Sequence, residues 1–485
     1  MLWHWVVYPG VFLALSPFGL PVTALIHPRR ANYSDIARYN VISDTHMQIP
    51  IRAMHKPDPV LHHLRSRYYE GPPPMSGQVL YQNISTIESS TYWVPVIVGG
   101  QQVNLIIDTG SSDTWVIADS YTCDRYIKRN GTRDPRRPDI GYNCGFGPGF
   151  DPDQSDTFQV RNPSNKSFAV QYVDTSGAFG YVGEDILSIA GMDINQTIGV
   201  ANLANWKGDH VTGGVLGLSY PGSTPSGEGH KPYDWVRNRT RNGSPEETRP
   251  KFDCHDTYPS LIENVAAQGY DPVFSIALSK SKYHLYQQGL VQNDVYNDSW
   301  VDGGLMTFGG IPNLKGLGLP FAKAKMNPWM DEETSCASNV SRIGYGLEVD
   351  GIADGSDMLS TGKFTTRLDT GCSMVLWPRA VARKILERVH PPPPLETPWR
   401  IACDAEFPEI KIVIGGVAIP FDRKLMIRQT LEPEYNWEGK AMCSTNFMMN
   451  IFGDDLILGA PFLQGVLAVY DIGHKEIRIA QRFEE

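Results

Sequence analysis

Short apolar runs that stop at turn residues recur along the chain, and this pattern predicts a mainly β protein. The clearest run, residues 103–107, is Val-Asn-Leu-Ile-Ile, and it stops at Asp108-Thr109-Gly110. An acid, a hydroxyl residue and a glycine after a run of branched apolar residues indicate an acid at a strand end. The same construction returns 261 positions later, where residues 364–368 lead into Asp369-Thr370-Gly371. One such turn could be an ordinary surface turn, but the framed pair predicts two related lobes with their acids together.

A second pair of motifs repeats in step with the first. Residues 213–218, Gly-Gly-Val-Leu-Gly-Leu, follow the first acid, and residues 455–460, Asp-Leu-Ile-Leu-Gly-Ala, follow the second. Each motif sets two apolar residues before a glycine, Gly217 or Gly459. Because glycine has no side chain, we expect another backbone segment to pass close to each of these two positions.

With these motifs the chain resembles the pepsin-like aspartic peptidases, in particular secreted eukaryotic members of the fungal type. Further shared motifs are Trp115, Phe150-Asp151-Pro152, Tyr172 with a glycine-containing hairpin to Asp185, residues 214–221, Phe308-Gly309-Gly310 and Ile457-Leu458-Gly459. The resemblance covers roughly residues 80–482 in the family's order. It implies a mainly β, bilobal acid protease fold with two pseudo-twofold-related β lobes around a central cleft. The N-terminal lobe is expected over residues 81–270 and the C-terminal lobe over 271–485.

The resemblance also assigns roles, with Asp108 and Asp369 as the catalytic acids. Residues expected to support them are Thr109 and Thr370, which tie the turns together, Gly110 and Gly371, which leave room for water and substrate, and Ser111, which donates to Asp108. Tyr172 resembles the tyrosine of the flap, a hairpin over bound peptide, and Trp115 its hydrogen-bonding partner. A plain core tyrosine on a strand is the alternative reading of Tyr172.

Two acids held together have a predictable chemistry. At about 3 Å and an effective dielectric near 20, two carboxylates repel by roughly 5 to 6 kcal/mol, so they share one proton. The ionised member can then take a proton from water while the protonated member hydrogen-bonds the substrate carbonyl. We therefore expect hydrolysis of internal peptide bonds at acid pH, without a covalent intermediate. By resemblance, bulky hydrophobic residues are preferred around the cut and no metal or organic cofactor is implied.

Two positions depart from the family pattern. Cys372 stands beside Asp369 where the family has a hydroxyl residue, and a thiol is a weaker donor. We expect Asp369 to be less stabilised as an anion. The acid limb of the pH–activity profile, where activity falls toward low pH, should then lie at a higher pH. The alternative is that Cys372 is an inert buried thiol. Val173 stands where glycine usually follows the flap tyrosine, so the resemblance supports the flap geometry and the substrate preference less closely than it supports the acid pair.

The first 80 residues differ from the rest of the chain. Residues 1–24 resemble a secretory signal because their apolar centre ends near small residues. A membrane anchor is the alternative, which the short length of the stretch and its prolines disfavour. Residues 25–80 carry seven Lys and Arg against four Asp and Glu, whereas residues 81–485 carry 36 against 49. A basic segment can lie over an acidic body, as an inhibitory propeptide released at acid pH would. A disordered leader without such a role is the alternative.

Cysteine usage agrees with export. There are seven cysteines, so at least one cannot pair within the chain. By order and by resemblance, the expected disulfides are Cys123 with Cys144, Cys403 with Cys443 and Cys254 with Cys336. No Cys-x-x-Cys or His-Glu-x-x-His spacing favours a zinc site. Nine Asn-x-Ser/Thr sequons allow glycosylation, and runs rich in Gly, Pro and polar residues predict surface insertions at about 124–149, 221–256 and 281–301.

The resulting hypothesis is a secreted aspartic endopeptidase that acts on polypeptides. We expect a monomer inhibited by its own propeptide, with no nucleic-acid or membrane partner, in the extracellular space or a vacuole-like compartment. The alternative is a non-catalytic homologue of the same fold that binds peptide or protein. Such homologues usually lose a catalytic Asp, a turn glycine or the flap tyrosine, and this chain has all of them. A structural or adhesive glycoprotein would leave the paired turns unexplained.

Overall fold

The computed structural model divides into two units, residues 1–50 and 51–485, which are described separately. The residues it describes are 5–8, 11–15, 21–23, 79–87, 91–123, 144–160, 166–172, 176–219, 227–228, 258–279, 301–312, 314, 317, 320–329, 344–355, 357–360, 362–393, 400–428, 434–435, 439–450 and 456–482. Almost all of the expected propeptide, most of the predicted insertions and the Cys254 and Cys336 pair lie outside these residues. Unit one contains a three-stranded antiparallel sheet, β1 (Trp5–Tyr8), β2 (Val11–Leu15) and β3 (Pro21–Thr23).

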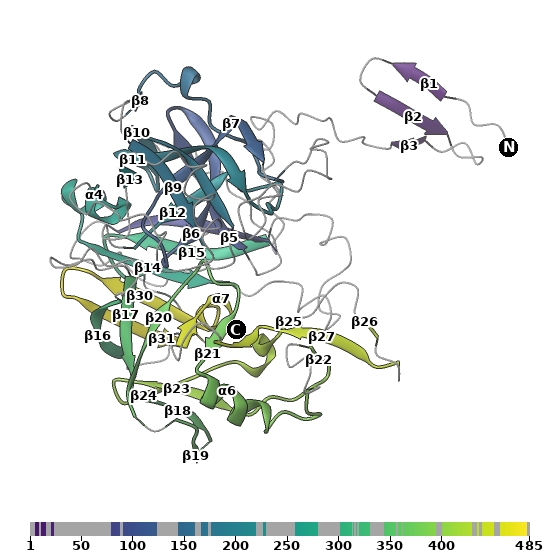
Figure 1. Ribbon diagram of the computed structural model, residues 1–485, viewed down its shortest axis with the longest axis vertical. Helices are drawn as coiled ribbons and strands as arrows, with labels where there is room; N and C mark the ends of the chain where they lie inside the picture. Colours follow the sequence, from purple (N-terminus) through teal and green to yellow (C-terminus); the bar gives the residue numbers. More distant parts are fainter. Residues whose placement is uncertain are drawn as a thin grey trace, which may run out of the picture. The chain divides into compact units, whose positions relative to one another are not determined.

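The second unit is built mainly of strands (Figure 1). Its N-terminal part contains β4 (Leu80–Ile87), β5 (Thr91–Val98), β6 (Gln101–Asp108), β7 (Trp115–Cys123), η1 (Pro152–Gln154), β8 (Gln159–Val160), β9 (Lys166–Gln171), β10 (Gly177–Ile189), β11 (Met192–Asn205), β12 (Gly214–Gly217), β13 (Gly227–Glu228) and α4 (Leu261–Ala267). Its C-terminal part contains β14 (Val273–Leu278), β15 (Val301–Phe308), β16 (Ala322–Trp329), β17 (Gly344–Val349), β18 (Gly351–Asp354), β19 (Asp357–Met358), β20 (Phe364–Leu368), β21 (Val375–Trp377), α6 (Arg379–Leu386), β22 (Arg400–Ala402), β23 (Ile410–Ile414), β24 (Val417–Pro420), η5 (Arg423–Met426), β25 (Ile427–Arg428), β26 (Glu434–Tyr435), β27 (Ala441–Thr445), β28 (Phe447–Met449), β29 (Leu456–Leu458), α7 (Ala460–Leu463), β30 (Val466–Asp471) and β31 (Glu476–Gln481). The predicted mainly β class is confirmed.

The two acid-bearing turns sit in matching strand arrangements. Strand β6 pairs in parallel with β12, and β12 also pairs antiparallel with β7. In the same way β20 pairs in parallel with β29, and β29 pairs antiparallel with β21. Strands β12 and β29 come from the second pair of sequence motifs. Each motif therefore supplies the strand beside an acid, which explains why both motifs repeat together.

The close backbone approach expected at the two motif glycines is confirmed. A Cβ placed on Gly217 would lie 2.4 Å from the carbonyl carbon of Ser112, and one on Gly459 would lie 2.1 Å from the Met374 oxygen. Both contacts are shorter than a side chain permits. The glycines thus let each acid-bearing turn pass directly over its neighbouring strand.

Strands from both parts of the chain join in one run of paired strands. Strand β5 pairs with β4, β4 with β15, β15 with β14, β14 with β30, β30 with β31, and β31 with β16. Strand β4 begins at Leu80, so the last residue of the expected propeptide is the first residue of a strand of this run. The sheet therefore ties the beginning, the middle and the end of the unit together.

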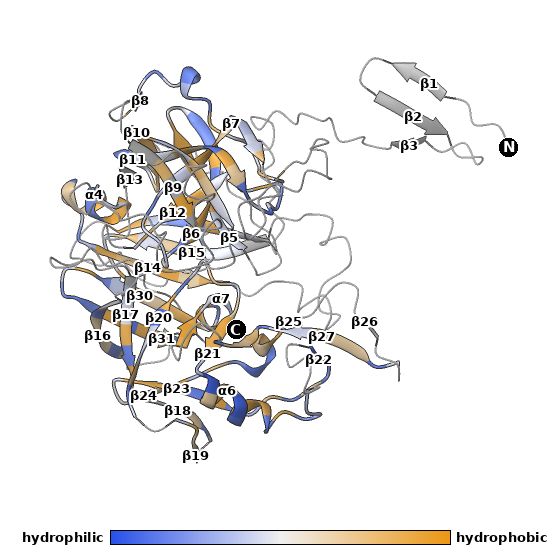
Figure 2. Ribbon diagram, in the orientation of Figure 1, coloured by the Kyte–Doolittle hydropathy of each residue, from blue (hydrophilic) through white to orange (hydrophobic). Residues whose placement is uncertain are grey.

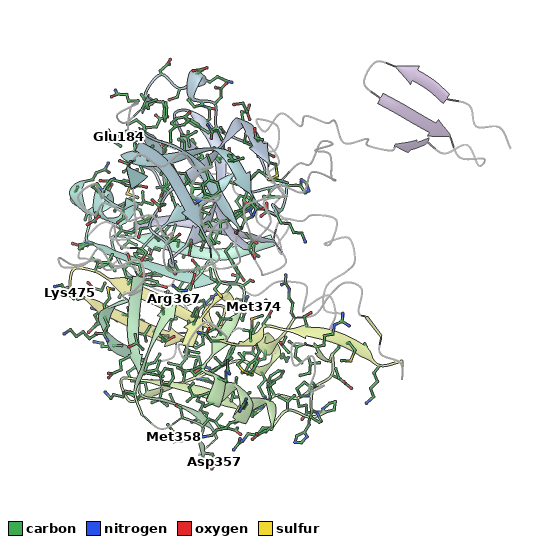
Figure 3. The ribbon with its side chains drawn as sticks, viewed as in Figure 1. Glu184, Asp357, Met358, Arg367, Met374 and Lys475 are labelled. Carbon is green, nitrogen blue, oxygen red and sulfur yellow. A yellow bond between two sulfur atoms is a disulfide. The ribbon has the colours of Figure 1, made fainter. Side chains whose placement is uncertain are left out.

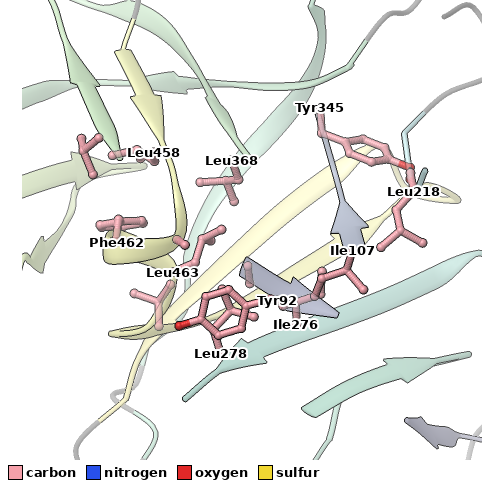
Figure 4. Close-up of a cluster of buried hydrophobic side chains, with 14 of the residues drawn as sticks. Tyr92, Ile107, Leu218, Ile276, Leu278, Tyr345, Leu368, Leu458, Phe462 and Leu463 are labelled. Atoms are coloured by element: carbon pink, nitrogen blue, oxygen red, sulfur yellow. The ribbon is translucent and has the colours of Figure 1, made fainter. Parts of the chain in front are cut away.

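The apolar core follows from strand alternation. In β5, buried and half-buried residues alternate from Val94 to Val98. Strand β14 is mostly hydrophobic, whereas α6 carries hydrophilic residues (Figure 2). Ile107 and Leu368, the residues just before the two acids, are buried in one cluster with Leu218 and Leu458 (Figure 4). The acids are thus carried on strand ends whose preceding side chains are packed. Among the residues described, no helix is long and apolar enough to span a membrane.

Candidate active site

The structure brings the two Asp-Thr-Gly turns together through their threonines. Thr109 N–H donates to Thr370 Oγ1 at 3.0 Å, and Thr370 N–H donates to Thr109 Oγ1 at 3.1 Å. Each hydroxyl also donates at 2.8 Å to a carbonyl of the opposite strand, Thr109 to Leu368 O and Thr370 to Ile107 O. These four hydrogen bonds are buried and reciprocal. They fix the spacing of the two turns and hence of the two acids.

The acids face one another across their turn glycines. Asp108 is 6% exposed and Asp369 is 8% exposed. A Cβ on Gly110 would lie 2.6 Å from Asp369 Oδ2, and a Cβ on Gly371 would lie 2.6 Å from Asp108 Oδ1. Each glycine therefore makes room for the carboxylate of the opposite turn, a more specific role than space for water and substrate.

Backbone and side-chain donors hold each carboxylate in place. Gly110 N–H donates to Asp108 Oδ1 at 2.8 Å, and Gly371 N–H donates to Asp369 Oδ1 at 3.0 Å. On the first acid, Ser111 Oγ also donates to Oδ2 at 2.5 Å. Burial and the charge of Asp369 nevertheless raise the pKa of Asp108 to about 7, against the lowering effect of the Ser111 and Gly110 hydrogen bonds. This acid therefore retains a proton at mildly acidic pH.

The second acid has different neighbours. Cys372 Sγ donates to Met374 O at 3.3 Å, and burial with the nearby Asp369 charge raises the pKa of this thiol to about 12. Asp369 forms an ion pair with the Arg367 guanidinium, in which Nε lies 3.6 Å from Asp369 Oδ2. Sequence reasoning missed Arg367. Strand alternation could have found it, because residues two apart on a strand lie on one face.

Tyr172 lies at the tip of a hairpin beside the first acid. Strands β9 and β10 pair antiparallel, and Tyr172 N–H donates to Ser176 O at 2.9 Å. Trp115 Nε1 donates to Tyr172 Oη at 2.9 Å. Burial and then the Asp108 charge raise the pKa of Tyr172 well above its usual value. Val173 lies outside the described residues.

Aromatic rings surround this tyrosine. Trp206 packs edge-on against Trp115 and Tyr172, with ring centroids 5.5 Å apart in each case. Phe146 stacks on Trp206 at 5.9 Å and is buried. The expectation that residues 124–149 form a surface insertion is therefore wrong at its end, because Phe146 completes this cluster. Trp206 follows β11 in a segment without a recognisable motif, and the sequence did not indicate its role.

A further buried acid lies near the first turn. Tyr258 Oη donates to Asp113 Oδ1, and burial raises the pKa of Asp113 to about 7 despite this hydrogen bond. The two residues are 145 positions apart, so no local sequence signal links them. Asp113, on the segment between Ser111 and Trp115, therefore keeps its proton below about pH 7.

Two disulfides are present among the residues described. They join Cys123 with Cys144 and Cys403 with Cys443, and Cys372 is free. The expected pair of Cys254 and Cys336 lies outside the described residues. Cys144 lies two residues before Phe146, so its disulfide anchors the segment that completes the aromatic cluster.

Matched strands, interlocked turns and two facing carboxylates define a β protein in which two similarly arranged halves share one acid site. The sequence matches the family of eukaryotic aspartyl proteases over residues 91–240 and 262–482. The chain belongs to this family, and its fold is the bilobal pepsin-like acid protease fold. The predicted family and fold are therefore confirmed.

Individual relatives are distant but extensive in coverage. A probable aspartic-type endopeptidase of Aspergillus fumigatus is 25% identical over 82% of this chain and 80% of its own length. Rhizopuspepsin of Rhizopus chinensis is 24% identical over 80% of this chain and 78% of its own length. Pepsin A of Suncus murinus is 23% identical, over 78% and 77% respectively. The similarity thus spans both halves of the site in fungal and animal proteins.

Proposed function

We propose that the protein is an aspartic endopeptidase that hydrolyses internal peptide bonds of polypeptides at acid pH, with Asp108 and Asp369 as its catalytic pair. The observation that carries the proposal is the crossed placement of each carboxylate against the turn glycine of the other half. Carboxylates this close cannot both ionise easily, so one proton is shared. One acid then takes a proton from a water molecule, and the other donates a hydrogen bond to the scissile carbonyl.

The aromatic cluster supports a preference for hydrophobic substrate residues. Tyr172 is close enough to Asp108 for that charge to raise its pKa, and Trp115 and Trp206 hold the ring in position. A bulky apolar side chain beside the scissile bond would gain contact area against these rings. We therefore propose bulky hydrophobic residues around the cut, with the hairpin of Tyr172 as the flap.

Export and self-inhibition complete the proposal. The apolar residues 1–24 and the basic residues 25–80 fit a secretory signal and a propeptide, and fungal aspartic endopeptidases are among the relatives. Release of the propeptide at acid pH follows from protonation of carboxylates on the acidic body, which weakens their attraction for its arginines. The mature enzyme would act in the extracellular space or a vacuole-like compartment.

The test is cleavage of a denatured protein by the acid-treated full chain from pH 2 to 7, with and without pepstatin. Asp108→Asn and Asp369→Asn should each lower kcat by about 10²–10⁴-fold or more, since general acid–base catalysis supplies this much. Asp357→Asn makes the same change at an exposed acid on β19 and should leave activity unchanged (Figure 3). A folded, processed chain without pepstatin-sensitive activity would refute the proposal and favour a non-catalytic binding protein.

A further inference from the structure

The two halves of the acid pair are alike in backbone but differ in what reaches their outer oxygens. The inner oxygen of each acid, Oδ1, accepts a hydrogen bond from the N–H of its own turn glycine. The outer oxygen of Asp108, Oδ2, accepts a hydrogen bond from the Ser111 hydroxyl. Beside Asp369 the matching side chain is Cys372, and its thiol donates to Met374 O. The second half therefore has no hydroxyl donor at this position. Instead, the Arg367 guanidinium lies near the outer oxygen of Asp369, with Nε 3.6 Å from Oδ2.

The strand that carries Asp369 also differs from its counterpart. Two residues before each acid stand Ile106 on β6 and Arg367 on β20. Ile106 pairs across the sheet with Trp93, whereas Arg367 pairs with Gly346. Because successive residues of a strand point to opposite faces, Arg367 lies on the face of Asp369. Gly346 contributes no side chain beside it, so the guanidinium has room next to the acid.

The arginine is partly shielded from water, and charged residues are present on the strands beside it. Its side chain is 20% exposed and that of Asp369 is 11% exposed, so solvent screens the ion pair only in part. On the neighbouring strand β17 the charged residue of this face is Glu348, which pairs with Lys363. On the other neighbouring strand, β29, the residue opposite Arg367 is the apolar Ile457. Asp108, at the end of β6, is close enough to Arg367 for the guanidinium charge to lower its pKa.

Four other titratable groups described beside the pair are neutral at acid pH. Burial raises the pKa values of Cys372 and of Tyr172, and burial likewise raises that of Tyr470 on β30. Asp113 is protonated below about pH 7. Arg367 is therefore the cation among the described residues whose ion pair reaches a carboxylate of the pair.

We propose that Arg367 is a positioning residue that does for Asp369 what the Ser111 hydroxyl does for Asp108, holding the negative charge of the pair on Asp369 and extending activity to lower pH. This inference rests on the proposed function. It reverses the expectation that Cys372 displaces the acid limb upward, because the guanidinium replaces the missing donor. The contact is an ion pair beyond hydrogen-bond length, so its effect is electrostatic.

The experiment is the pH profile of kcat/KM from pH 2 to 7, measured with an uncharged peptide substrate. A cation within 4–6 Å lowers the pKa of a carboxyl group by about 1–3 units, so Arg367→Met should raise the acid limb by about one to two pH units. Arg367→Lys keeps a charge and should move the limb less. Ile106→Met, the matched change in the other half, should leave the position of the limb unchanged.

Two further variants separate the arginine from the cysteine. Cys372→Thr should shift the acid limb of the otherwise unchanged enzyme by less than about half a pH unit, because Arg367 already stabilises the anion. In the Arg367→Met background the same change should bring the limb back toward its original position. A large downward shift with Cys372→Thr alone would overturn the proposal, and this test does not need Arg367→Met to fold.

The proposal would also fail if Arg367→Met left the profile where it was. It would equally fail if the variant slowed only peptides with Asp or Glu next to the cut, since Arg367 would then bind substrate. An unmodified enzyme that is inactive at every pH would instead refute the proposed function. The two hypotheses therefore fail by different results.

Discussion

Thr109 and Thr370 each make two hydrogen bonds to the opposite turn with one hydroxyl, and Thr109→Val removes both at once. The change removes the hydrogen-bonding partner of two buried groups, the Leu368 carbonyl and the Thr370 N–H. A buried group left without its partner costs about 1–3 kcal/mol, so the free energy of unfolding should fall by about 2–6 kcal/mol. Because Leu368 directly precedes Asp369, the acid should also be misplaced. A displacement near 1 Å can cost about 10²-fold in rate.

The assay is urea unfolding of the processed protein, combined with kcat on a peptide substrate. Thr109→Ser is the matched control because it keeps the hydroxyl and loses one methyl group, which should cost about 1 kcal/mol. Thr445→Val is a second control, since that hydroxyl donates to Phe447 O at 2.7 Å and makes no part of the interlocked turns. It should lower stability with little effect on kcat. If Thr109→Val matched Thr109→Ser in both stability and rate, the interlocked threonines would not hold the pair together.

Stability should depend on pH through Asp108 and Asp113, whose pKa values burial raises from 3.8 to about 7. The unfolded chain releases these protons above about pH 4 and the folded protein keeps them, so stability is greatest below that pH. It should fall as pH rises to 7, by at most about 1.4 kcal/mol per pH unit for each acid. Asp113→Asn should flatten this fall in urea unfolding, and an equal slope would contradict the assignment. Trp206→Leu removes ring contacts with Trp115 and Tyr172 worth about 0.5–1.5 kcal/mol each, so KM should rise while Trp206→Phe changes it less. An unchanged KM would separate Trp206 from the flap.

The sequence was sufficient for the parts of the fold that depend on local pattern. Runs such as residues 103–107 have the branched apolar residues of a buried strand. Each run ends at an Asp-Thr-Gly turn, a combination of residues that few other structures require. The glycines at 217 and 459 predicted close backbone approach, and the structure has it. These features depend on neighbours in sequence, which is why they could be predicted without coordinates.

Other features depend on contacts between distant residues. Phe146 was assigned to a surface insertion because its surroundings are rich in glycine, yet it is buried against Trp206 from a segment some 60 positions away. Tyr258 reaches Asp113 across 145 positions. Composition describes only the neighbourhood of a residue, so it could not indicate either contact.

The electrostatic asymmetry of the acid pair shows what a comparison of matching positions leaves out. Cys372, considered alone, predicted a weakened anion at Asp369, because only the residue at the matching position was compared with the family. The charge state of a carboxyl group depends on everything within a few ångströms, and strand geometry brings Arg367 there from two residues upstream. Two halves with the same strand arrangement have residues at corresponding positions, but corresponding residues do not need to have the same role. A donor lost from the turn can be replaced by a cation on the strand, provided that the opposite strand offers a glycine to make room for it.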